Sequence, residues 1–104
     1  MKRAPRARQP LVELFEVFRT AVGTGDDAAL ARLWARDAAP ALEIFQHNSA
    51  RVRAQGWTLA LSQIAEDGVV ATMTFEVREA SGALVGTGEL TATEEPEGWR
   101  IRGL

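Results

Sequence analysis

The second half of the chain alternates apolar and polar side chains, and this alternation constrains the fold more than any other feature. Four stretches, near residues 57–65, 69–78, 83–93 and 98–102, place apolar residues at every second position. A period of two is typical of strands that bury one face. Glycines or a proline separate the stretches, as expected of hairpin turns. The pattern therefore predicts a four-stranded antiparallel meander with one apolar face.

Turn chemistry predicts a register for this sheet. Loops at residues 66–68, 79–82 and 94–97 pair the residues that flank them: Ala65 with Val69, Arg78 with Ala83, and Thr93 with Gly98. The register gathers the apolar residues on one concave face: Trp57, Leu59, Leu61, Val69, Ala71, Met73, Phe75, Val77, Leu84, Leu90, Ala92, Trp99 and Ile101. Gln63 is then the one polar side chain on that face, which carries no ionisable residue.

The first half predicts three helices, over residues 11–22, 28–36 and 40–55. An apolar stripe with spacings of three and four marks the first of them: Leu11, Leu14, Phe15, Phe18 and Val22. Asp26 and Asp27 offer a cap for the second helix, and Gly56 follows the third. Residues 1–10 show no apolar periodicity, and we expect a disordered basic arm followed by one domain over residues 11–104.

Three helices followed by a curved sheet that ends in Trp99-Arg100-Ile101 resemble the nuclear-transport-factor-2-like, cystatin-like α+β superfamily. The segment 25–38, GDDAALARLWARDA, is similar to the second helix of that superfamily, which often runs from Gly-Asp to Asp-Ala. The resemblance covers residues 11–104 and implies an α+β fold with three helices packed on a curved four-stranded sheet. Residues 35–40 leave no room for the extra strand that many members carry, so we expect a compact member.

The superfamily that the chain resembles includes enzymes that place acidic, Tyr or His side chains inside the cone-shaped pocket of the curved sheet. Burial there shifts the pKa values of these side chains toward neutrality. The sequence contains no Tyr and no Cys, and its single histidine, His47, falls off the apolar stripe of the third helix. We therefore expect no catalytic residue, no metal site and no cofactor. A degenerate isomerase or cyclase that uses His47 and Glu43 is retained as an alternative.

Two surfaces remain as candidate binding sites. The first is an apolar pocket for a small molecule, bounded by Trp57, Met73, Phe75, Gly86, Gly88 and Trp99. The second is the outer face of the sheet, where the predicted register sets Thr74 opposite Thr87 and Glu89 opposite Arg102. Its candidate dimer residues are Thr72, Thr74, Val85, Thr87, Glu89 and Arg102.

The expected function is a non-catalytic, homodimeric interaction or binding module, with binding of an apolar small molecule as the alternative. No run of apolar residues is long enough for a membrane span, and four positive charges in the arm, Lys2, Arg3, Arg6 and Arg8, are too few to indicate nucleic-acid binding. The single lysine beside eleven arginines is typical of a GC-rich genome, and we expect a bacterial, cytoplasmic protein.

Overall fold

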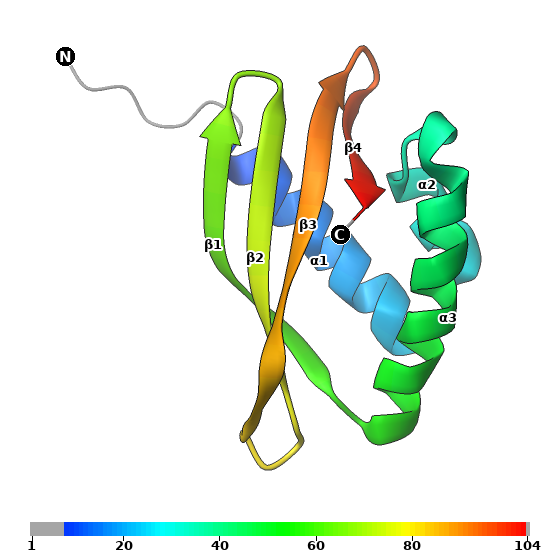
Figure 1. Cartoon of the computed structure of the whole chain (residues 1–104), viewed down its shortest axis with the longest axis vertical. Coiled ribbons are helices and arrows are strands. Elements are labelled where there is room, and N and C mark those ends of the chain that lie inside the picture. The colour runs from blue at the N-terminus through cyan, green and yellow to red at the C-terminus, as the bar shows by residue number, and fades with distance from the viewer. Residues whose placement is uncertain (1–7, 104) are drawn as a thin grey trace, which may run out of the picture.

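The computed structural model describes residues 8–103, which form three α-helices, a short 3-10 helix and a four-stranded antiparallel sheet (Figure 1). The elements follow in chain order: α1 (Arg8–Thr24), α2 (Asp27–Leu33), η1 (Arg36–Ala38), α3 (Ala39–Gln55), β1 (Thr58–Asp67), β2 (Val70–Arg78), β3 (Leu84–Glu95) and β4 (Gly98–Gly103). The predicted α+β class and its order of elements are confirmed. α1 begins within the predicted arm, whose other residues, 1–7, lie outside the described part of the chain.

Local sequence signals set the ends of the helices. The Asp26 carboxylate accepts a hydrogen bond from the backbone N–H of Ala29 at 3.0 Å and caps α2. α3 ends at Gly56, which takes the left-handed conformation at φ 69° that a side chain would disfavour. Because both caps are short-range, the sequence alone locates these ends.

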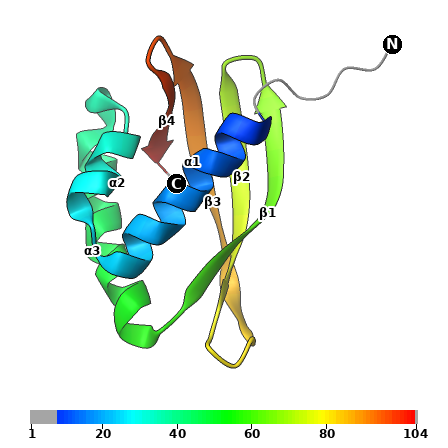
Figure 2. The same ribbon diagram turned by 180° about the vertical axis from the view of Figure 1, so that it is seen from behind.

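The helices cover one face of the sheet. α1 runs diagonally across that face, and α2 and α3 lie beside β4 (Figures 1 and 2). The stripe predicted on α1 is buried against the sheet, and Phe15 and Phe18 lie within 6.1 Å of Phe75, measured between ring centroids. No described helix covers the opposite face, which we call the outer face (Figure 1). No described helix is long and apolar enough to cross a membrane.

The observed register differs from the predicted one at all three hairpins. The turns between β1 and β2 and between β3 and β4 contain two residues each, so Asp67 pairs with Val70 and Glu95 with Gly98. Between β2 and β3, Phe75 pairs with Gly88 rather than Gly86. This last shift moves the pairing by two residues and leaves the side chains from Val70 to Val77 and from Gly86 to Thr93 on their predicted faces. A further register shift between Val77 and Arg78 makes Val85 an extra residue and places Leu84 opposite Arg78, so the prediction of Leu84 on the concave face was wrong.

A β-bulge at Ser62 changes the faces of β1. The register slips between Leu61 and Gln63, and the Ser62 hydroxyl donates to the carbonyl of Thr74 at 3.1 Å. Ile64 consequently pairs with Met73 and packs against the core, whereas Gln63 is exposed opposite Thr74. The prediction of Gln63 on the concave face was wrong, because an extra residue in a strand inverts the alternation beyond it.

Two apolar residues predicted on the concave face are exposed at the hairpins. Val69 is 59% exposed because it sits in the two-residue turn, and Leu84 is 54% exposed where β3 begins. The concave face also reaches acidic residues at its hairpin end, since Glu66 pairs with Ala71 and Glu94 pairs with Trp99. The centre of the concave face therefore carries no ionisable residue, as predicted, but the prediction was wrong at the hairpin end, where Glu66 and Glu94 lie.

Candidate functional site

The six residues predicted to bound a pocket do not all meet at one hollow. Phe75 covers Gly88 so closely that a Cβ built on the glycine would lie 2.6 Å from the ring carbon Cζ. Met73 and Trp99 are buried in the core, whereas nothing lies within 4 Å of a Cβ built on Gly86. Trp57 precedes β1 and lines a separate hollow. Phe75 thus fills space that the prediction assigned to a ligand.

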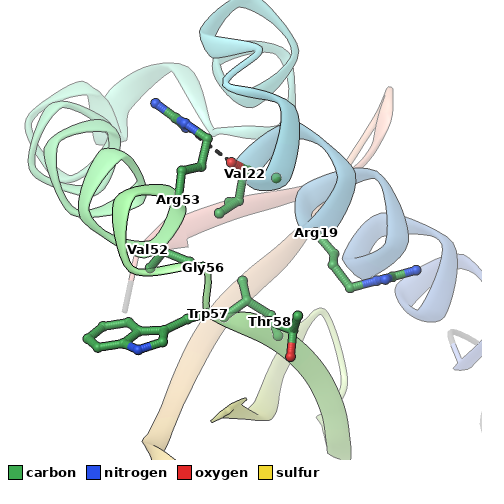
Figure 3. Close-up of a pocket in the computed structure, with 9 residues that line it drawn as sticks. Arg19, Val22, Val52, Arg53, Gly56, Trp57 and Thr58 are labelled. Atoms are coloured by element: carbon green, nitrogen blue, oxygen red, sulfur yellow. Dashed lines mark hydrogen bonds between the residues drawn. The ribbon is translucent and has the colours of Figure 1, made fainter. Parts of the chain in front are cut away.

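The hollow beside Trp57 lies where α1 and α3 end and β1 begins, and its volume is about 270 Å³ (Figure 3). Val22, Val52 and Leu59 give it apolar walls. The long side chains of Arg19, Arg53 and Trp57 point in different directions around it rather than converging (Figure 3). It therefore offers an apolar surface without the converging polar groups that orient a ligand.

Arg53 has a structural role at this hollow, because its side chain donates hydrogen bonds that join α3 to α1. Its Nη1 donates to the carbonyl oxygen of Val22 at 3.0 Å and to the hydroxyl of Ser49 at 3.4 Å. Val22 lies in the last turn of α1, where carbonyl groups lack helical partners and favour a positive charge. Arg53 therefore ties α3 to the end of α1, a role that its spacing in the sequence did not reveal.

The histidine offers no catalytic arrangement in the described residues. His47 and Glu43 are both exposed on α3, and their side chains form no hydrogen bond or ion pair with each other. Residues 8–103 contain no group of three or more His, Cys, Asp or Glu side chains that could hold a metal ion.

The outer face holds four of the six residues predicted for a dimer interface. Thr72 pairs with Thr91, Thr74 with Glu89, and Thr87 with Glu76, so the predicted pairing of Thr74 with Thr87 was wrong. Val85 is 42% exposed at a register shift where β3 begins. The outer face also carries charged side chains, since Glu76 and Glu89 lie among its threonines and Arg78 binds the Glu76 carboxylate at 2.8 Å.

Arg102 lies elsewhere than predicted. It is the extra residue in a register shift of β4, and its guanidinium binds Asp37 of η1 at 2.7 Å and approaches Glu95 at 3.8 Å. The predicted pair of Arg102 with Glu89 was wrong because the bulge turns Arg102 toward η1. The hydrogen bond from Arg102 holds the pKa of the Asp37 carboxyl below its ordinary value of 3.8.

No protein-family model matches the sequence, and no curated protein matches it. Solved structures do match. The protein named Rd1NTF2_04 with long sheet superposes with a TM-score of 0.69 at 15% identity, over 88% of this chain and 94% of the other. A protein of the NTF2-like family from Streptomyces avermitilis gives 0.60 at 18% identity, over 89% and 88% of the two chains. The chain has the NTF2-like fold.

A candidate ketosteroid isomerase from Shewanella frigidimarina shares this NTF2-like fold, with a TM-score of 0.64 at 15% identity over 88% of this chain and 89% of that one. Identities this low establish the fold alone, since one fold carries many functions. The function of this chain therefore has to be inferred from the side chains at its candidate sites.

Proposed function

We propose that this NTF2-like protein is a non-catalytic, homodimeric binding module whose two copies join through the outer face of the sheet. The observation that supports this proposal is that α1 covers one face of the sheet and no described helix covers the other. Val70, on the uncovered side, is 39% exposed, and threonines dominate the strip around it. Short side chains allow two such sheets to approach closely.

The size of the outer face sets the expected strength of the dimer. Four strands spaced about 4.8 Å apart and about 30 Å long give a footprint of roughly 570 Å² per copy. Two copies would bury about 1,100 Å², near the lower end of stable interfaces. We therefore expect a dimer that dissociates on dilution rather than an obligate one.

Charge sets the arrangement of the two copies. Glu89 lies on β3, opposite Thr74 of β2, near the middle of the outer face. It makes no ion pair within residues 8–103. Two Glu89 carboxylates brought together would repel each other, so the two-fold axis keeps them apart. Burial of an unpaired carboxylate in the interface still costs desolvation energy, so Glu89→Gln, which replaces the carboxylate by an amide, should tighten the dimer.

Native mass spectrometry and light scattering over a dilution series test this proposal. We expect twice the chain mass for the wild type, the chain mass for Thr72→Arg, which lies opposite Thr91 rather than a carboxylate, and a dimer for the control Asn48→Arg, which adds the same charge on exposed α3. A wild-type monomer at high concentration, or equal dimer populations in the two variants, would refute the interface.

A second candidate function is binding of an apolar small molecule. It is favoured by the open space above Gly86 on the concave side and by the apolar walls of the hollow beside Trp57. Mass in excess of the chain mass in the native spectrum, lost when the protein is denatured, would indicate a bound molecule and support this function. Gly86→Val should then abolish uptake without unfolding, and a variant that binds normally would contradict a site at Gly86.

A further inference from the structure

A groove follows the exposed side of α1. It consists of two hollows of about 370 and 400 Å³ that both contain Val17, which is 47% exposed. The first hollow lies between the second half of α1 and the start of α2, next to Ala29. The second lies between the first half of α1, Leu33 of α2 and the turn between β3 and β4. α1 and α2 lie side by side on the helix-covered side of the molecule (Figure 2).

The floor of this α1 groove is apolar and well supported. Leu14 and Trp99 line it and are 8% and 7% exposed, so their side chains are held by the core. Val17 is exposed because it falls outside the stripe that faces the sheet. Buried aromatic and aliphatic groups around one exposed apolar residue are the arrangement on which a partner's apolar side chains anchor.

The charges that line the groove have a single sign. Glu16 and Asp26 line the first hollow, Glu13 and Glu94 line the second, and no Lys, Arg or His residue among residues 8–103 lines either hollow. Glu16 also binds Arg19, whose side chain lies against the hollow beside Trp57 instead. Each of the other two described hollows is lined by arginines. Within the described part of the chain, the charged side chains that border the apolar floor are therefore all carboxylates.

We propose that the α1 groove binds a basic amphipathic helix of a partner protein. The groove extends along α1 from Pro10 to Thr24, which spans about 21 Å at 1.5 Å per residue. This length accommodates about four turns of a partner helix, whose apolar residues at spacings of three, four and seven would contact Val17 and its neighbours. Lys or Arg residues on the flanks of that helix would meet the carboxylates of Glu13 and Glu94, since Glu16 binds Arg19 and Asp26 caps α2. Helices line most of the groove, so side-chain contacts rather than strand pairing would hold the partner.

This inference is independent of the proposed dimer. α1 covers the face of the sheet opposite the outer face, so the groove of each copy would lie away from the dimer interface. A failure of dimerisation would leave the groove intact, and a failure of groove binding would leave the dimer interface intact.

The probe for the experiment is a fluorescein-labelled helical peptide with Leu at spacings of three, four and seven and Lys on both flanks. Fluorescence anisotropy should report micromolar binding to the wild-type protein. Val17→Asp should weaken binding at least about tenfold, because it places a charge on the apolar floor. Ile44→Asp is the matched control, since Ile44 is 64% exposed on α3 and the substitution adds the same charge away from the groove.

Charge reversal separates groove binding from general attraction between a basic peptide and an acidic protein. The double variant Glu13→Lys/Glu94→Lys should lose the Lys peptide and gain affinity for a peptide with Glu in place of Lys. Equal binding by the Val17→Asp and Ile44→Asp proteins would overturn the proposal. Absence of peptide binding, together with self-association that Val17→Asp abolishes, would also overturn it and assign the groove to a second copy of the chain.

Discussion

The contact between Phe75 and Gly88 predicts opposite effects for the same substitution at two neighbouring glycines. A Cβ on Gly88 would lie 2.6 Å from Cζ of Phe75, so the ring must retreat by about 0.8 Å to reach the 3.4 Å of ordinary contact. The ring cannot retreat freely, because it is 5% exposed and packs against Phe15 and Phe18. Overpacking of this kind costs about 1–3 kcal/mol. Gly88→Ala should therefore lower the melting temperature by at least about 4 °C.

Gly86→Ala is the matched control for this experiment. Nothing lies within 4 Å of the added Cβ, and the backbone of Gly86 does not have a positive φ. The alanine restricts the unfolded chain and should stabilise the protein by about 0.4–1 kcal/mol. Urea unfolding followed by tryptophan fluorescence measures both variants, and a Phe75→Leu background should reduce the cost of Gly88→Ala. Equal unfolding midpoints for the two alanine variants would refute the reasoning.

Two further predictions concern the ends of the short helices. Asp26→Ala removes the cap of α2 and should lower the free energy of unfolding by about 0.5–2 kcal/mol. Asp26→Asn should retain most of the capping stabilisation, because the amide oxygen also accepts a hydrogen bond. Equal melting temperatures for the alanine and asparagine variants would contradict the capping role. The pKa of Asp37 is lowered by the hydrogen bond from Arg102, so the pair stabilises the fold above pH 3.8 and this contribution is lost as the pH falls through the lowered pKa. Melting curves of wild type and Asp37→Asn should differ at pH 7 and converge at pH 2, and a constant difference would show that Asp37 acts by another route.

The sequence predicted the elements of this fold better than their pairing. Alternation and capping are local signals, so the three helices and four strands could be located directly. The predicted end of the second helix at Arg36 was wrong, because α2 ends at Leu33 and Trp34 is extended beside Ile101. A shift of two residues between β2 and β3 leaves the faces of the paired residues from Val70 to Val77 unchanged, and the apolar pattern therefore could not distinguish Gly86 from Gly88 as the partner of Phe75. The bulge at Ser62 could not be seen either, because serine is compatible with both regular and bulged strands.

The candidate sites show the same division between local and tertiary information. The threonines of the outer face were found because their alternation is local, whereas Arg102 was misplaced by a bulge. The α1 groove was missed because it depends on how α2 and the turn between β3 and β4 sit beside α1. Val17 was the available signal, as an apolar residue outside the stripe of its helix.

The two edges of the sheet are unequal, and this limits how copies could join in a line. A parallel bridge between Trp34 and Ile101, with the N–H of Ala35 bonded to the Ile101 carbonyl at 2.7 Å, covers the middle of the β4 edge. Within residues 8–103, β1 pairs with β2 alone, and its first eight residues, Thr58 to Ala65, include no charge and no proline. A filament needs two edges that can each accept a strand. Strand addition to this sheet would therefore terminate at two molecules instead of growing into a fibre.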